Sequence, residues 1–195
     1  MSARKVDLFR RTNILTRLFF TVEEARLRHE KFDGGMTKPM TRLCLHRRHG
    51  VAVILHETDS NSLIFTEQFR YPTYENGPGW LIELPAGIID PGDDPLETVC
   101  RETEEETGYQ VEASRFRHIY TFYLSPGGSS ERIYLYYVTV TTQDKKAEGG
   151  GLEEEDENVR VLKMPIDEAR AKLDAGEFMD SKTLVGLQWF FAQQK

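Results

Sequence analysis

The sequence predicts an α+β sandwich around a mixed sheet. Segments rich in β-branched and aromatic residues, bounded by turn-forming residues, fill most of the chain. A strongly marked amphipathic helix interrupts them, and two further helical segments close the chain. The strands and helices alternate too irregularly for a Rossmann fold.

The expected strands begin near the N-terminus. Residues 14–32 mix β-branched and aromatic residues with charges, which is typical of short strands, and the Asp-Gly-Gly at residues 33–35 indicates a turn. More strands follow, of which the first pair and the last pair each form a hairpin. They cover residues 50–56, 63–70, 80–84, 116–124 and 131–142.

The best-marked helix covers residues 95–107. Asp94 precedes it as the expected N-cap, Pro95 suits the first helical position, and Gly108 ends it. Two C-terminal helices are expected, one at residues 166–173 with Gly176 beyond it, and one at residues 181–194, which is rich in large apolar side chains.

Length and composition exclude several classes of protein. With 195 residues, 39% of them hydrophobic, the chain can build the core of one domain and is not disordered throughout. It contains neither a run of about 20 apolar residues, as a membrane span requires, nor a secretory signal. Cys44 and Cys100 are too few for a disulfide framework, so we expect buried thiols and a cytoplasmic location.

The net charge of −7 is unevenly distributed. Residues 1–48 hold 12 Lys and Arg against 5 Asp and Glu, and the remaining chain carries −14. Acidic clusters favour metal ions, whereas the basic segment favours phosphates or an acidic surface of another subunit. No nucleic-acid-binding motif accompanies the basic charge, so nucleic acid is not an expected partner.

The helix at residues 95–107 carries an unusual acidic cluster. Wound at about 100° per residue, it places Glu102, Glu105 and Glu106 beside the apolar arc, near its C-terminal end. Like charges repel there, and the helix dipole disfavours anions at that end. Carboxylates are preferred ligands of Mg²⁺ and Mn²⁺, so the cluster indicates either a metal site or a solvated acidic face.

This stretch resembles the Nudix box, whose pattern is G-x5-E-x7-R-E-U-x-E-E-x-G-U, with U a bulky apolar residue. Asp93 stands where the pattern has Glu, and Thr103 replaces an aliphatic residue. Tyr109 is an acceptable final apolar residue. The matching positions are Gly87, Arg101, Glu102, Glu105, Glu106 and Gly108.

The resemblance extends over about residues 45–195. Residues 67–70, 83–87 and 125–128, with Glu131, look like the ADP-ribose and nucleoside-diphosphate-sugar pyrophosphatase branch. The glycines at 149–151 and the segment 180–183 lean toward its GDP-mannose-cleaving members. The resemblance therefore implies an α/β/α sandwich around the mixed sheet.

The resemblance also implies roles for individual residues. Mg²⁺ or Mn²⁺ would be held by Glu102, Glu106 and the Ala86 carbonyl, with Glu105 in support. Arg101 would orient a box carboxylate, and Gly87 and Gly108 would be structural. The general base would come from the acidic run after residue 152, with Glu155 as first choice and Glu157 as second.

Expected substrate contacts lie outside the box. Arg70 is a candidate clamp on the diphosphate or, equally, the partner of a nearby acid. Residues 125–128 form a turn in either case, and Glu131 is either a contact or an exposed residue. Phe69, Tyr71, Tyr74 and Trp80 could stack on a base, although such residues more often belong to a core. The expected substrate-binding set is Arg70, Glu83, Gly127, Gly128 and Glu131.

The implied activity is metal-dependent hydrolysis of the diphosphate linkage of ADP-ribose or a related nucleoside diphosphate sugar. Two alternatives stay open: GDP-mannose as the main substrate, and a non-catalytic nucleotide-sugar sensor on the same fold. We expect an N-terminal strand segment at residues 1–45, used for homodimerisation, and a Nudix hydrolase domain at residues 46–195.

Overall fold

The computed structural model describes residues 4–18, 20–151 and 158–194. The chain divides into two compact units. The N-terminal unit contains the chain up to Arg48 together with Tyr123–Glu131. The larger unit contains His49–Phe122 and the chain from Arg132 onward.

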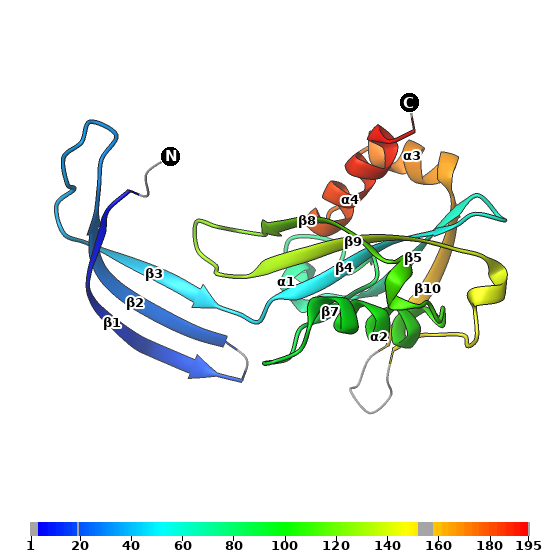
Figure 1. The fold of residues 1–195 in the computed structure, drawn as a ribbon, viewed down its shortest axis with the longest axis horizontal. Coiled ribbons are helices and arrows are strands. Elements are labelled where there is room, and N and C mark those ends of the chain that lie inside the picture. The colour runs from blue at the N-terminus through cyan, green and yellow to red at the C-terminus, as the bar shows by residue number, and fades with distance from the viewer. Residues whose placement is uncertain (1–3, 19, 152–157, 195) are drawn as a thin grey trace. The chain divides into compact units, whose positions relative to one another are not determined.

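The N-terminal unit contains an antiparallel sheet in the order β1-β2-β3 (Figure 1). Ala25 is the one buried side chain among its described residues. The expected turn lies between β2 and β3, where Gly34 has a φ of +88°. The sheet is longer than predicted, because charged side chains on its open faces hide the alternation in the sequence. Its strands are β1 (Val6–Arg17), β2 (Phe20–His29) and β3 (Met40–His46).

The larger unit is built on a mixed sheet in the order β10-β5-β4-β9-β8, with β6 paired to β5 and β7 to β4. It is mixed because β4 runs parallel to β9 but antiparallel to β5 and β7. Both predicted hairpins are present, as β4–β5 and β8–β9. The strands are β4 (Gly50–Glu57), β5 (Ser62–Phe69), β6 (Trp80–Glu83), β7 (Ala86–Ile88), β8 (Arg117–Tyr123), β9 (Arg132–Val140) and β10 (Arg160–Pro165).

Helices cover both faces of this sheet, which confirms the predicted sandwich (Figure 1). On one face, Val51 and Val53 of β4 share a buried cluster with Val99 of α2. On the other face, Gly186 of α4 lies against Ile54, and a Cβ atom there would approach the Ile54 side chain to 3.2 Å. The helices are α1 (Tyr71–Tyr74), α2 (Pro95–Thr107), α3 (Ile166–Asp174) and α4 (Ser181–Ala192).

Several features differ from expectation. β3, β7, β10 and the short α1 were not predicted, and α4 ends at Ala192 rather than at residue 194. Cys44 and Cys100 are free thiols but only partly buried, so the expectation of buried thiols was wrong. Among the described residues, no helix has the length and apolar character needed to span a membrane.

Candidate active site

The box helix α2 begins and ends where its sequence predicts. The Asp94 carboxylate accepts hydrogen bonds from the Leu96 N–H at 2.8 Å and the Glu97 N–H at 3.4 Å, which is an N-cap. At the other end Gly108 has a φ of +75°, a left-handed conformation that glycine adopts without strain. These two ends fix which residues lie on the last turns.

Glu106 is buried, with 2% of its surface exposed. Its Oε2 accepts a hydrogen bond from the Ala86 N–H at 2.9 Å. Burying a carboxylate costs free energy unless the group is hydrogen-bonded or paired. The hydrogen bond from Ala86 therefore stabilises Glu106 at this place against β7. The sequence predicted that Glu106 lies at the edge of the core; the structure places it inside.

Glu102 lies against the same strand. A Cβ atom at Gly87 would overlap the carboxylate carbon of Glu102, so a side chain at this position would displace that carboxylate. Glu102 and Glu106, one helical turn apart, therefore both face Ala86–Gly87. This arrangement brings together the residues that the resemblance assigns to metal binding.

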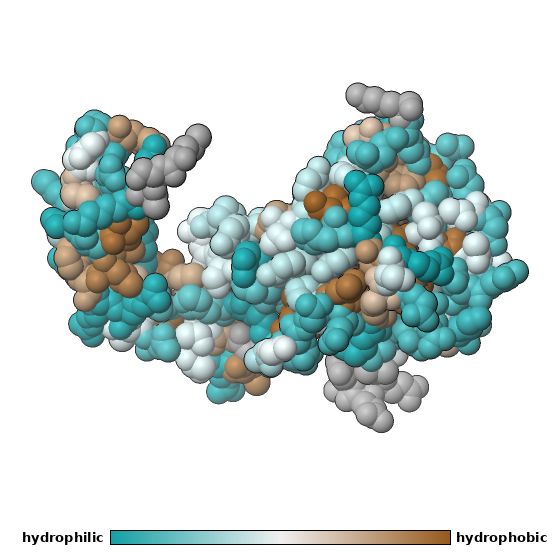
Figure 2. Space-filling model, in the orientation of Figure 1, coloured by the Kyte–Doolittle hydropathy of each residue, from teal (hydrophilic) through white to brown (hydrophobic). Residues whose placement is uncertain are grey.

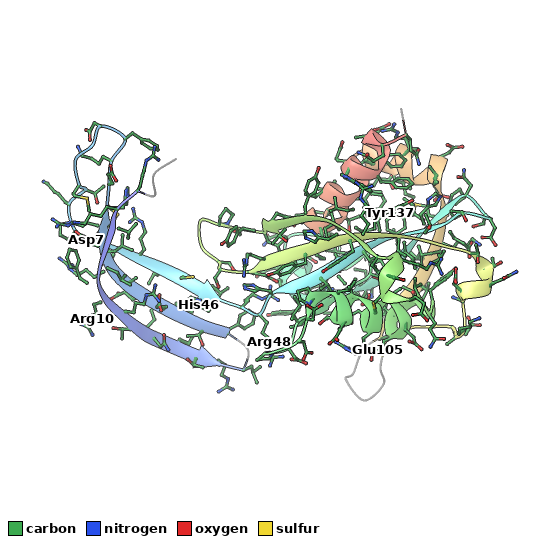
Figure 3. All side chains as sticks on the ribbon, in the orientation of Figure 1. Asp7, Arg10, His46, Arg48, Glu105 and Tyr137 are labelled. Atoms are coloured by element: carbon green, nitrogen blue, oxygen red, sulfur yellow. The ribbon has the colours of Figure 1, made fainter. Side chains whose placement is uncertain are left out.

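Arg101 connects two box carboxylates. Its Nη2 donates to Glu102 Oε1 at 2.7 Å and its Nη1 to Glu105 Oε2 at 2.6 Å; Glu105 is visible on α2 in Figure 3. Burial alone would lower the pKa of Arg101, but Glu102 and Glu105 outweigh it and raise that pKa. Arg101 thus bridges two acids, whereas the resemblance implied that it would orient one box carboxylate.

The described residues contain no group of three or more His, Cys, Asp or Glu side chains arranged to hold a metal ion. Their chemistry nevertheless fits a hard divalent cation, because Glu102, Glu105 and Glu106 offer only oxygen donors. Gly87 also leaves the space that the Glu102 carboxylate occupies. A cation entering here would compete with Arg101 for the oxygens of Glu102 and Glu105.

Arg70 pairs with Glu83. Arg70 Nη2 donates to Glu83 Oε2 at 2.7 Å and Nε at 3.2 Å, and Glu83 is only 3% exposed. Burial alone would lower the pKa of Arg70, but Glu83, Glu106 and Asp180 raise it. Of the two alternatives for Arg70, the pairing with a nearby acid is therefore present in the structure.

Sequence reasoning missed Lys182, which is a second positively charged side chain near Glu83. Its Nζ lies 2.7 Å from Asp180 Oδ1 and 3.9 Å from Glu83 Oε2, and its side chain is only 12% exposed. Asp180 also caps α4 by accepting from the Thr183 N–H at 2.9 Å. Burial would raise the pKa of Asp180, but Lys182 and Thr183 outweigh it and lower that pKa. The segment 180–183 was noticed in the sequence only as a motif, because its contact with Glu83 is long-range.

The remaining predicted residues lie elsewhere. Gly127, Gly128 and Glu131 belong to the N-terminal unit. The turn at 125–128 is present, with the Gly128 N–H donating to the Ser125 carbonyl at 3.1 Å, and Glu131 pairs with Arg47 at 3.0 Å. Glu155 and Glu157 lie outside the described residues.

Of the two alternatives for the aromatic residues around α1, a place in the core is contradicted by their exposure, and stacking on a base stays a prediction. The exposed fractions are 42% for Phe69, 77% for Tyr71, 61% for Tyr74 and 57% for Trp80.

Comparison with known proteins agrees with this geometry. The NUDIX domain family matches residues 46–183. A GDP-mannose pyrophosphatase from Cronobacter sakazakii is 36% identical over 177 residues, which cover 90% of each chain. A second, from Yersinia enterocolitica, is 35% identical, and the match covers 80% of this chain and 81% of the relative. A third, from Yersinia pestis, is 34% identical, and the match covers 82% of this chain and 79% of the relative. The chain therefore belongs to the Nudix family.

Proposed function

We propose that this Nudix hydrolase cleaves the diphosphate linkage of a nucleoside diphosphate sugar to a nucleoside monophosphate and a sugar phosphate. The observation that carries the proposal is the pair Glu102 and Glu106 facing Ala86–Gly87. ADP-ribose and GDP-mannose are the substrates to compare. The names of the relatives favour GDP-mannose as the first to test.

In this proposal Glu102 and Glu106, with the Ala86 carbonyl, hold Mg²⁺ or Mn²⁺, and Glu105 supports them. When bound, the ion neutralises diphosphate charge and lowers the pKa of a water ligand. Arg101 keeps Glu102 and Glu105 oriented through its two hydrogen bonds. The buried Glu106 is held by the Ala86 N–H, so its carboxylate loses little freedom on binding.

The attacking water must lose its proton to a base near phosphorus. We assign this role to Glu155, with Glu157 as the second choice. Arg70 would contact the diphosphate, with Glu83 orienting its guanidinium. Gly127, Gly128 and Glu131 are further candidates for substrate contact.

The protein is further proposed to act as a cytoplasmic homodimer through residues 1–45. The described part of the N-terminal unit exposes many apolar side chains, including Leu8 at 44% and Leu15 at 58%, which supports a covering partner copy. Two free cysteines fit a reducing compartment. Light scattering at micromolar concentration tests this part, and a monomer would reject it.

A substrate panel tests the main proposal. Purified protein with Mg²⁺ is offered GDP-mannose, ADP-ribose and ADP-glucose, and a coupled phosphatase releases phosphate from the products for colorimetric detection. Turnover of at least one substrate, dependent on the ion, is expected. No turnover of any substrate rejects the hydrolase. Nucleotide-sugar binding by calorimetry that is unaffected by metal would then support the non-catalytic sensor.

A further inference from the structure

The last turn of α2 has its carbonyls satisfied by a segment far along the chain. A helix end normally leaves these groups without intrahelical partners. The Gly150 N–H donates to the Glu106 carbonyl at 2.8 Å, and the Gly151 N–H donates to the Glu105 carbonyl at 3.2 Å. Both acceptor residues, Glu105 and Glu106, belong to the acidic cluster of the Nudix box.

The contact continues on either side of these bonds. The Lys146 and Ala147 N–H groups donate to the Gly108 carbonyl at 2.8 and 3.2 Å, and Lys145 Nζ lies 3.4 Å from the Thr107 carbonyl. The ammonium group brings positive charge to the end of the helix where the dipole is negative. We call residues 145–151 the cap segment.

Glycine is required for this close approach. Gly149, Gly150 and Gly151 have φ values of +76°, +118° and +82°, a region that other residues adopt only with strain. A Cβ atom at Gly149 would lie 2.5 Å from the Glu106 carbonyl oxygen and 2.7 Å from the Thr107 Cα. Any side chain at this position would push the cap segment and α2 apart.

The cap segment therefore fixes Glu106 from a second direction. Gly150 holds its backbone carbonyl at 2.8 Å, while the Ala86 N–H holds its carboxylate at 2.9 Å. Without the cap, the last turn would carry three acidic residues at the unfavourable end of the dipole and would fray more readily. The position of Glu105 and Glu106 along the helix axis, and the direction in which their side chains project around it, thus depend on Gly149–Gly151.

We propose that Gly149–Gly151 is a positioning element for the metal site, because it sets the last turn of α2 from which Glu105 and Glu106 project. The inference rests on the proposed function, in which these carboxylates serve a divalent cation. The glycines touch neither substrate nor metal; they act through the helix.

The test compares Gly149→Ala with Gly176→Ala. Gly176 ends α3 with a φ of +72°, and a Cβ atom there meets nothing within 4 Å, so this control carries the backbone strain without the collision. Mn²⁺ binding is measured by electron paramagnetic resonance, and kcat and KM on GDP-mannose are measured separately. Gly149→Ala should bind Mn²⁺ about tenfold more weakly and lower kcat, as losses of groups that orient metal ligands do. Gly176→Ala should match the wild type in both measurements.

Mn²⁺ affinity in Gly149→Ala equal to that of Gly176→Ala would overturn the proposal. If circular dichroism shows that Gly149→Ala does not fold, Gly150→Ala replaces it, because its Cβ atom would come no closer than 3.4 Å to the Val159 carbonyl. It should show a smaller shift in the same direction, and wild-type Mn²⁺ affinity there also overturns the proposal.

The wild-type protein supplies a readout that needs no variant. On addition of Mn²⁺, hydrogen exchange at the amides of Gly150 and Gly151 should slow together with that of Ala86, and slowing at Ala86 alone contradicts the proposal. A wild type that binds Mn²⁺ but hydrolyses no nucleotide sugar rejects the proposed function only, since the Mn²⁺ comparison still decides the positioning role. A wild type that does not bind Mn²⁺ rejects both.

Discussion

The two sheets of this protein differ most in what their strands bury. In the N-terminal sheet only Ala25 is buried among the described residues of that unit, and apolar side chains such as Ile14 and Leu15 are more than half exposed. In β4 of the larger unit, Val51, Ile54 and Leu55 are fully buried. The brown patches in Figure 2 include apolar side chains of the N-terminal unit. A sheet needs a covered apolar face for independent stability, so the larger unit is stabilised from within and the N-terminal sheet is not.

The charged groups of the two units differ in the same way. Glu57 in the larger unit is 1% exposed and accepts a hydrogen bond from the Tyr109 hydroxyl at 2.6 Å. In the N-terminal unit, Lys31 and Asp33 pair at 2.7 Å with 45% and 66% of their side chains exposed. Exposed pairs contribute little, whereas leaving one member of a buried pair alone is costly. We therefore expect the largest mutational effects in the larger unit.

The largest effect is expected at Glu106. Glu106→Gln keeps the volume and an oxygen that can accept from the Ala86 N–H, but it removes the charge. By analogy with the loss of one electrostatic group from an active site, kcat should fall about 10²–10³-fold. Initial rates on the best substrate of the panel measure this.

Glu104→Gln is the matched control, because Glu104 lies on the same helix but is exposed. Its rate should stay within about twofold of the wild type, as is usual for surface substitutions. Circular dichroism should show both variants folded. Equal activity of the two variants would remove Glu106 from the active site.

The second expected effect is the difference in stability lost when one leucine is truncated in each of the two sheets. Leu55→Ala should lower the free energy of unfolding by about 2–5 kcal/mol, because it deletes a fully buried side chain of β4. Leu15→Ala should change it by less than about 0.5 kcal/mol in the monomer, since Leu15 is 58% exposed. Urea unfolding measures both values.

Protein concentration sharpens this test. If a second copy covers β1, the cost of Leu15→Ala should grow with concentration, since dimerisation couples to stability. Light scattering should then show weaker dimers. A large, concentration-independent loss in Leu15→Ala would instead mean that the N-terminal sheet has a core of its own.

Locally determined features were predictable from the sequence. The bounds of α2 follow from Asp94 and Gly108, which act on their own neighbours, and the β4–β5 hairpin follows from adjacent segments. β10 was missed because its place depends on pairing with β5, Arg160 opposite Glu67, far apart in the chain.

In the candidate active site, too, local features were predictable and long-range contacts were not. The positions of Glu102, Glu105 and Glu106 follow from helical spacing. The burial of Glu106, the pairing of Arg70 with Glu83 and the approach of Lys182 depend on long-range contacts. The glycines at 149–151 were visible as a motif, but their hydrogen bonds to α2 were not.

The smallest expected effect concerns the response to pH. Hydrogen bonds from Arg115 and Thr141 lower the pKa of Asp144 from 3.8 to about 2, although burial opposes them. A carboxyl group whose pKa is lower in the folded state stabilises the fold fully above pH 3.8. This contribution is lost as the pH falls from 3.8 toward 2. After screening by solvent, we expect it to be about 1 kcal/mol at pH 7.

Asp144→Asn should therefore lower the free energy of unfolding at pH 7 and 5, and should converge with the wild type near pH 2, as urea unfolding at each pH would show.

Asp7→Asn is the counterpart in the N-terminal unit, where Arg28 lowers the pKa of Asp7. That pair lies on a sheet without a core, with 40% of the Arg28 side chain exposed, so unfolding of the larger unit should not respond to it at any pH. A pH-independent loss in Asp144→Asn would assign the effect to its hydrogen bonds with Thr141 rather than to its charge. An equal loss in Asp7→Asn would mean that the two units unfold together, and the contrast between their sheets would then describe burial but not stability.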